Sequence, residues 1–275
     1  MTQSWAQNFS SASADAASIY ENVMVPSVFN PWAEVLLDLV TPRPGEAVID
    51  VACGPGTVAR LAAARVGPDG TVLGVDFSPA MLATARAKPP VEGGATVEYV
   101  EAPADHLPAG DASFDVVTCQ QGLQFFPDRP AAVGEIRRVL RPGGRAAIAV
   151  WCEVDSSPPF AAVAGAVAEV LGEDAAAMYR GGPWGMSGHA VDELCRAAGF
   201  RSVEGERRSL PLALAGGADV LFSTLAVTAL AQQVGALDDE RGPALRQAIA
   251  RRLAPLMVDG VFRSHATSHL TVARL

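Results

Sequence analysis

The stretch AVIDVACGPGTVARL, residues 47–61, begins as an apolar strand and ends as a helix, with a glycine-rich turn between them. Within it, Gly54, Gly56 and Ala59 follow the spacing G-x-G-x-x-A. Such a turn between a buried strand and a helix is typical of the first loop of a doubly wound α/β sheet. The spacing is formally that of a dinucleotide-binding loop, but a lone glycine pattern is weak evidence for the ligand.

From this stretch onward, short apolar runs typical of strands alternate with patterns typical of helices. Strands are expected at 47–52, 71–77, 95–102, 114–120 and 145–151, and helices at 57–66, 78–88 and 129–140. This rhythm predicts βαβ units that form one largely parallel sheet. Later strands are expected at 201–214 and 262–275, with helices at 157–171, at 189–200 and within 217–254. The predicted segments are an N-terminal helical cap (1–42), a ligand-binding core (43–152), a helical insert (153–190) and the remainder of the sheet and helices (191–275).

The composition narrows the class of partner. The 275 residues are 49% hydrophobic, with 21 Lys and Arg against 30 Asp and Glu, a net charge of −9. This charge opposes non-specific attraction to nucleic acid and to anionic lipid, so a small or neutral substrate is expected. The N-terminus shows neither a secretory signal nor a membrane-spanning run, which predicts a cytoplasmic protein. Four separate cysteines fit reduced thiols better than a disulfide framework.

Two carboxylates near the glycine-rich loop bear on the identity of its ligand. Asp76 closes the second strand, 20 residues after Gly56, where an acid can accept hydrogen bonds from two ribose hydroxyls. Asp50 stands four residues before Gly54, where its charge would repel a pyrophosphate. S-adenosylmethionine has a ribose, a sulfonium and an ammonium but no phosphate. Both kinds of ligand carry a ribose that Asp76 could bind, so Asp50 is the residue that favours S-adenosylmethionine over a dinucleotide.

Four motifs in order resemble the class I S-adenosylmethionine-dependent methyltransferases, especially the bacterial small-molecule branch that includes the ubiquinone and menaquinone biosynthesis enzymes. They are VIDVACGPG, VLGVDFSPAMLATAR, HLPAGDASFDVVTCQQGLQFFPD and VLRPGGR, all within residues 43–152. The resemblance implies a Rossmann-like, doubly wound, seven-stranded and mostly parallel sheet with one antiparallel strand near an edge. It also implies a lid formed by the insert, S-adenosyl-L-methionine as cofactor and S-adenosyl-L-homocysteine as product.

The resemblance also implies the roles of individual positions. The loop positions Ala52, Gly54 and Gly56 would receive the methionine part of the cofactor above Asp50, and Asp76 would bind the ribose. Residues of the adenine site would be Phe77, Met81, Ala104 and Asp105, and Gln120 would face the methionine end. Gln121 and Gln124 would lie on the substrate side. For Met81 and Phe77 a role in core packing stands beside the cofactor role.

Two positions depart from the family pattern. Ala52 stands where the family commonly has Gly. Pro103 stands where relatives often carry an Asp that pairs with the adenine amino group, and proline has neither a carboxylate nor an N–H. Asp105 or a backbone carbonyl must then replace that contact.

The sequence selects no catalytic base and no metal site. The candidate bases are His106, His189, His265 and His269, and for each a surface or packing role is the simpler interpretation. Cys53, Cys119 and Cys152 end three predicted strands, but no fourth ligand is evident, so buried packing is favoured over metal binding.

Aromatic and sulfur-containing side chains predict the nature of the methyl acceptor. Tyr20 and Phe29 lie in the N-terminal segment and Trp184 in the insert, and both segments contain few Lys and Arg. They favour a lipophilic or aromatic acceptor, such as a quinone precursor, polyketide or terpenoid of secondary metabolism, bound by a monomer or homodimer. These side chains could equally form the core of the insert. Two further alternatives are a protein that keeps the cofactor but catalyses another reaction, such as a cyclisation, and a nicotinamide-dependent oxidoreductase.

Overall fold

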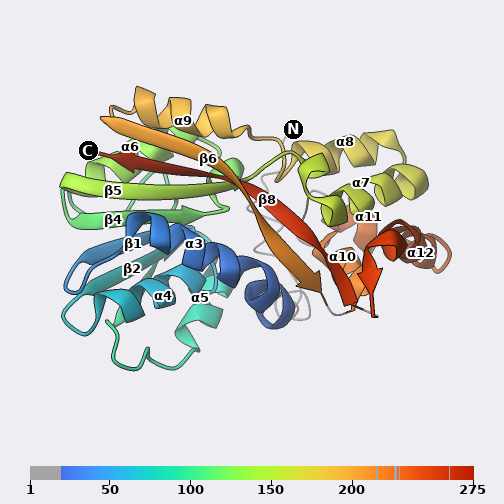
Figure 1. Cartoon of the computed structure of the whole chain (residues 1–275), viewed down its shortest axis with the longest axis horizontal. Coiled ribbons are helices and arrows are strands. Elements are labelled where there is room, and N and C mark those ends of the chain that lie inside the picture. Colours follow the sequence, from blue (N-terminus) through green and yellow to red (C-terminus); the bar gives the residue numbers. More distant parts are fainter. Residues whose placement is uncertain (1–19, 215, 226–227, 229, 260) are drawn as a thin grey trace. The chain divides into compact units, whose positions relative to one another are not determined.

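The computed structural model describes residues 20–214, 216–225, 228, 230–259 and 261–275 (Figure 1). The chain divides into two compact units. The sheet unit contains Phe29–Val150, Gly188–Arg207 and His269–Leu275. The helical unit contains Met1–Val28, Trp151–Ser187 and Arg208–Ser268, and of its first range residues 20–28 are described. The segment boundaries expected from the sequence stay a prediction.

The central sheet has seven strands on its main path, in the order β3-β2-β1-β4-β5-β8-β6, and β7 pairs with β8. The pairs from β3 to β5 are parallel, and β7 with β8 is antiparallel. The predicted α/β fold with a mostly parallel sheet is therefore confirmed. The strands are β1 (Ala47–Val51), β2 (Thr71–Asp76), β3 (Val97–Glu101), β4 (Phe114–Gln120), β5 (Leu140–Trp151), β6 (Ser202–Leu214), β7 (Met257–Val258) and β8 (Val261–Arg274).

Strand β1 lies inside the sheet, between β2 and β4. All five of its side chains are buried, as expected for an apolar strand with a neighbour on each side. Its Asp50 is in register with Gly74 of β2 and with Thr118 of β4. The one acidic residue of this strand therefore lies inside the sheet unit between two neighbouring strands.

Five helices accompany the strands in the sheet unit. They are α3 (Asn30–Val40), α4 (Thr57–Val66), α5 (Pro79–Arg86), α6 (Arg129–Val139) and α9 (Gly188–Ala197). Helix α3 contacts α4, while α6 contacts α9. Capping side chains begin two of these helices: Ser78 accepts a hydrogen bond from the Met81 N–H, and Asp128 accepts one from the Ala131 N–H. Proline follows each cap, which fixes the start of the helix.

Strand β5 begins earlier than the sequence indicates. The segment RPGG was expected to be a turn before a strand at 145–151, but β5 starts at Leu140 and includes it. Leu140 pairs with Phe114, and the register then shifts so that Arg145 pairs with Val116. Gly143 has a φ of 81°, a conformation that glycine adopts without a steric penalty. The glycine-rich turn is thus an irregularity within the strand.

The helical unit is built mainly from α7 (Pro158–Leu171), α8 (Glu173–Gly181), α10 (Gly217–Thr224), α11 (Ala231–Gly235) and α12 (Arg241–Leu253). Helix α7 packs against α8, α10 and α12. Beside these helices lies an aromatic cluster of four buried side chains, Trp151, Phe160, Tyr179 and Trp184. The Trp184 ring centroid lies 4.5 Å from that of Phe160, 5.7 Å from that of Trp151 and 6.2 Å from that of Tyr179. These are ordinary distances for packed aromatic pairs.

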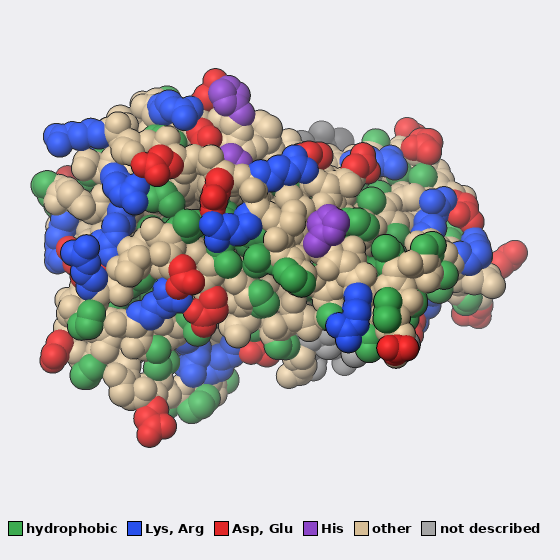
Figure 2. All heavy atoms as spheres, in the orientation of Figure 1, with side chains coloured by type: hydrophobic (Ala, Val, Ile, Leu, Met, Phe, Trp, Pro, Cys, Tyr) green, Lys and Arg blue, Asp and Glu red, His purple; other side chains and the backbone are tan. Residues whose placement is uncertain are grey.

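The surface carries both signs of charge. Figure 2 shows Lys and Arg side chains interspersed with Asp and Glu on the face that it displays. Several of these side chains form ion pairs, among them Arg65 with Glu34 and Arg251 with Glu169. Over the described residues, every helix is too short or too polar to span a lipid bilayer.

Candidate functional site

The glycine-rich loop joins β1 to α4 and contains three residues in left-handed backbone conformations. Ala52 has a φ of 58°, Gly54 of 52° and Gly56 of 83°. A Cβ on Gly54 would meet no atom within 4 Å, so this side of the loop is open. A Cβ on Gly56 would lie 2.3 Å from the hydroxyl oxygen of Tyr99, so no larger residue fits there. The loop is therefore shaped both by backbone conformation and by a side chain beneath it.

Asp50 lies beneath this loop with only 1% of its surface exposed. One carboxylate oxygen accepts a hydrogen bond from the Ala59 N–H at 3.1 Å, and the other accepts one from the Thr118 hydroxyl at 2.8 Å. Burial raises the pKa of Asp50 from 3.8 to about 7, because a charged carboxylate loses its hydration there. Asp50 thus ties the first turn of α4 to strand β4.

Asp76 ends β2 and is also buried, with 7% of its surface exposed. Its two oxygens accept hydrogen bonds from the Gly54 N–H at 2.8 Å and the Ser78 N–H at 2.9 Å. Burial raises the pKa of this carboxyl group. A carboxylate has about four acceptor positions, so acceptor capacity remains for a ligand. The next residue, Phe77, is one of the few exposed large apolar side chains.

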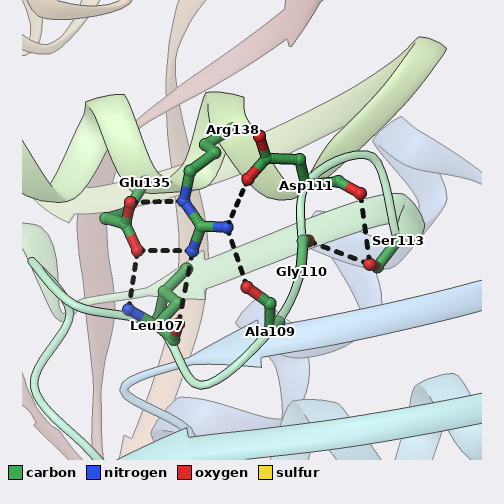
Figure 3. A network of polar contacts seen from close by, with 7 residues as sticks. All are labelled: Leu107, Ala109, Gly110, Asp111, Ser113, Glu135 and Arg138. Atoms are coloured by element: carbon green, nitrogen blue, oxygen red, sulfur yellow. Dashed lines mark hydrogen bonds and ion pairs between the residues drawn. The ribbon is translucent and has the colours of Figure 1, made fainter.

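The predicted adenine residues Ala104 and Asp105 lie on the loop between β3 and β4, and Met81 is buried in α5. Figure 3 shows how the following residues are anchored by Arg138 of α6. Its guanidinium donates to both carboxylate oxygens of Glu135, to the carbonyls of Leu107 and Ala109 and to a carboxylate oxygen of Asp111. Glu135 also accepts the Leu107 N–H at 2.8 Å. The hydrogen bonds from Arg138 lower the pKa of Glu135, so the pair stays charged.

Three glutamines mark the end of β4. The Gln120 side-chain N–H donates to the backbone carbonyl of Phe29 at 2.9 Å, which joins two residues predicted for the site. Gln121 is buried and has a φ of 55°, a strained conformation for a residue with a side chain. Gln124 follows in a short 3-10 helix and is 3% exposed. The strand ends of β1 and β4 therefore both carry a left-handed residue, Ala52 and Gln121.

Two further predicted residues, Tyr20 and Trp184, belong to the helical unit. Trp184 belongs to the aromatic cluster of the helical unit, as described above. The side chain of Tyr20 lies outside the described residues. Their roles toward a substrate stay predictions. Packing accounts for the buried position of Trp184.

None of the four histidines forms a hydrogen bond with Asp50 or Asp76 in the described part of the chain. His106, His189 and His265 are exposed, and His189 pairs with Glu193 on its own helix. The His269 Nε2 lies 3.1 Å from a carboxylate oxygen of Asp192. It stands on β8, which β4 and β5 separate from β1. The described hydrogen bonds thus tie no histidine to these two carboxylates.

The cysteines are all buried and free of disulfide bonds. Burial raises the pKa of Cys119 to about 12, so its thiol stays protonated. Across the described ranges, no group of three His, Cys, Asp or Glu side chains is placed to hold a metal ion.

Sequence reasoning missed Thr118, Tyr99 and Arg138. Each contacts a site element from a distant part of the chain, so no local spacing reveals it. Arg138 directly precedes the motif VLRPGGR. Its role depends on the tertiary structure, because the loop between β3 and β4 folds against α6 and brings the Ala109 carbonyl to Arg138.

The residues fit S-adenosylmethionine. The open side of Gly54, the two buried carboxylates and the exposed Phe77 ring provide space, acceptors and an apolar surface at the ends of β1 and β2. A family model, the ubiE/COQ5 methyltransferase family, matches residues 4–163, more than half of the chain. The chain belongs to this family. The resemblance inferred from the four motifs is therefore confirmed, and the protein is an S-adenosylmethionine-dependent methyltransferase.

Individual relatives agree with the family. A nocamycin O-methyltransferase of Saccharothrix syringae is 38% identical over 71% of this chain and 73% of its own length. A demethylmenaquinone methyltransferase of Thermus thermophilus is 40% identical over 42% of this chain, which spans only 51% of that relative.

Among solved structures, phosphoethanolamine N-methyltransferase 2 of Haemonchus contortus, solved with S-adenosylhomocysteine, aligns with a TM-score of 0.64 at 19% identity. The alignment covers 99% of this chain and 60% of that one. At this identity the likeness concerns the fold.

Proposed function

We propose that this methyltransferase transfers the methyl group of S-adenosylmethionine to a small lipophilic or aromatic acceptor, such as a quinone precursor, a polyketide or a terpenoid. S-adenosylmethionine supplies a methyl group on a positively charged sulfur. The rate of such a displacement depends on orientation and on exclusion of water more than on covalent participation of the protein.

The proposal assigns cofactor roles to residues at the ends of β1, β2 and β4. Asp76 binds the ribose hydroxyls with its remaining acceptor capacity. Gly54 and Gly56 let the backbone approach the methionine part, and Asp50 holds the loop in place through Ala59. Phe77 and Met81 contact the adenine, with Ala104 and Asp105 at its edge. Gln120 faces the methionine end.

The proposal about the acceptor rests on the uncharged stretch that begins at the end of β4. Residues 119–126, CQQGLQFF, contain three carboxamides and two phenylalanines but no charged side chain. Carboxamides bind polar groups without supplying a charge, and the phenylalanines favour apolar or aromatic ones. The relatives named for nocamycin and demethylmenaquinone are consistent with a small organic acceptor. The proposed substrate residues are Tyr20, Phe29, Gln121, Gln124 and Trp184.

A carboxamide neither accepts nor releases a proton at neutral pH. The three glutamines therefore cannot act as the general base. We infer that the acceptor loses its proton to solvent or arrives already ionised.

The test of the cofactor site is the affinity for S-adenosylhomocysteine of the unchanged protein and of Asp76→Ala, measured by calorimetry. Loss of charged hydrogen bonds to the ribose is expected to weaken binding by about 1.5–3 kcal/mol, roughly 10- to 100-fold. Asp69→Ala is the matched control, since Asp69 is an exposed carboxylate before the other end of β2. It should leave the affinity unchanged.

Three results would contradict this proposal. An unchanged affinity in Asp76→Ala rejects the ribose assignment. Stabilisation by a nicotinamide dinucleotide but not by S-adenosylhomocysteine favours an oxidoreductase. Cofactor binding without methyl transfer to any member of a quinol, phenol and terpenoid panel favours a non-methylating reaction.

A further inference from the structure

Gln124 carries a buried carboxamide that makes no hydrogen bond with any described residue. Its side-chain oxygen and nitrogen are both buried, and neither has a hydrogen-bond partner among the described residues. Only 3% of the residue is exposed. A buried polar group without a partner loses its hydration and gains nothing in return, so such groups are rare in folded proteins. The Gln124 side chain therefore offers one hydrogen-bond donor group and one acceptor to a ligand next to the end of β4.

Arg129 adds a second unused donor beside this carboxamide. It stands at the start of α6, and its Nη2 donates to the backbone carbonyl of Gln124 at 2.7 Å. Its Nε is buried and has no partner within the described ranges. This hydrogen bond brings the Arg129 guanidinium to the backbone of Gln124, the residue that carries the unpaired carboxamide.

Two other arginines of the sheet unit, Arg138 and Arg145, have carboxylate partners. Arg138 makes five hydrogen bonds from its three nitrogens, as Figure 3 shows. Arg145 reaches Glu46 with two nitrogens, at 3.0 Å and 2.8 Å, and also donates to the carbonyls of Val40 and Thr41. Arg129 has no carboxylate partner in the part of the chain that is described. Arg60 and Arg86 likewise donate to backbone carbonyls, so what distinguishes Arg129 is a buried Nε that has no partner among the described residues.

We propose that Gln124 and Arg129 form an oxyanion clasp, in which their two N–H groups donate to the nucleophilic oxygen of the methyl acceptor. This inference rests on the proposed function and narrows the acceptor to an oxygen acid: a phenol, an enol or a carboxylic acid. Hydrogen bonds to a charged oxygen are stronger than those to a neutral one. The positive guanidinium therefore favours the ionised form of the acceptor and lowers the pKa of its hydroxyl group.

The reaction balances without a protein base. The acceptor hydroxyl releases its proton to solvent, and the resulting oxygen anion forms a bond to the methyl carbon. The bond between that carbon and sulfur breaks, and its electron pair stays on sulfur, which becomes neutral. Arg129 stays protonated throughout, so it acts as a donor and not as an acid or a base.

The test uses the full chain saturated with S-adenosylhomocysteine and two probes of equal shape, 1-naphthoate and 1-naphthamide, titrated by calorimetry near neutral pH. The unchanged protein is expected to bind the anion more tightly than the amide. Arg129→Gln should weaken 1-naphthoate binding by about 10- to 100-fold, the range for a lost charged hydrogen bond. Gln124→Leu should weaken it several-fold, and 1-naphthamide should change less than twofold in both variants.

Matched variants separate recognition from structure. Arg137→Gln removes an exposed arginine of the same helix and should leave both probes unaffected. Arg129→Lys keeps the charge but lacks the Nε–H, so an intermediate loss is expected. Gln124→Met replaces Gln124→Leu if that variant does not fold. Because Gln124→Leu removes two buried unpaired atoms, its melting temperature should equal or exceed that of the unchanged protein.

The inference is overturned if 1-naphthoate fails to bind at millimolar concentration, if it binds no more tightly than 1-naphthamide, or if the Arg129 and Gln124 variants bind it as the unchanged protein does. A fall in affinity for both probes together, with a lower melting temperature, assigns these residues a purely structural role. Binding of S-adenosylhomocysteine is measured first. A failure of this binding counts against the proposed cofactor site. Normal cofactor binding, together with an affinity for 1-naphthoate that the substitutions do not change, counts against the clasp alone.

Discussion

Two regions of the molecule achieve burial in opposite ways. At the ends of β1 and β2 in the sheet unit, two buried carboxylates, Asp50 and Asp76, accept hydrogen bonds from backbone amides and a hydroxyl. In the helical unit, the aromatic cluster buries rings against rings. The first region is stabilised by a few directional hydrogen bonds next to strained backbone. The stability of the second region depends on the apolar area that its rings bury.

The difference indicates in which region side chains can be substituted without loss of cofactor binding. Directional contacts to buried charges keep a single geometry, because a displaced partner leaves a charge without hydration. Apolar packing is non-directional, and its contribution scales with the area removed from water. Changes in the aromatic cluster should therefore alter stability, whereas changes at the strand ends should alter cofactor affinity and pH dependence.

The largest expected effect is on the aromatic cluster. Phe160→Ala should lower the free energy of unfolding by about 3–5 kcal/mol, because it removes a ring from a packed site and leaves a cavity. Urea unfolding measures this loss. Met178→Ala, in the same unit but 45% exposed, should change the stability little. A loss below about 1 kcal/mol for Phe160→Ala would show that the ring is not packed as described.

The second prediction concerns Asp50 and pH. The pKa of about 7 means that the folded protein holds a proton that the unfolded chain releases near its ordinary value of 3.8. The contribution of Asp50 to the free energy of unfolding should therefore fall by about 1.4 kcal/mol per pH unit as pH rises between these values, and should level off above the folded pKa. The difference between the unchanged protein and Asp50→Asn, measured by urea unfolding across this range, isolates this slope. A flat difference would contradict it.

The third prediction concerns the loop of Figure 3. Arg138→Gln removes the donors that hold the Leu107 and Ala109 carbonyls, so the loop that carries Ala104 and Asp105 should lose its fixed position. We expect S-adenosylhomocysteine to bind about 3- to 10-fold more weakly, as for one or two net hydrogen bonds. Arg141→Gln, which breaks one exposed ion pair with Asp115, is the control. Equal effects in both variants would argue against an anchoring role.

The smallest expected effect is at Ala52. Its φ of 58° is costly for a residue with a Cβ, and Ala52→Gly removes that cost, estimated at about 1–2 kcal/mol. The greater freedom of glycine in the unfolded chain offsets roughly 0.5–1 kcal/mol of the gain. The melting temperature should rise slightly or stay constant. A clear decrease would show that the Ala52 methyl group makes a packing contact that outweighs the strain.

Much of the fold and part of the site could be predicted from the sequence. The order of strands and helices follows from apolar periodicity and turn residues, which act locally, and β1, β2 and α4 lie where these patterns place them. The loop glycines and the acids at the strand ends were found for the same reason. Strand β5 was misjudged at its start because a register shift depends on the pairing partner Phe114, which no local pattern reveals.

The sequence by itself determined the α/β class, the glycine-rich loop and the presence of Asp50 and Asp76 beside it, because these depend on residues close together in the chain. Only the tertiary structure decided what those residues contact. Thr118 reaches Asp50 from 68 residues away because β4, and not β3, lies next to β1. Likewise, only the folded chain shows that the Gln124 carboxamide and the Nε of Arg129 are buried without partners among the described residues. Whether a buried polar group is satisfied depends on all its neighbours in space, and that is a property of the folded chain.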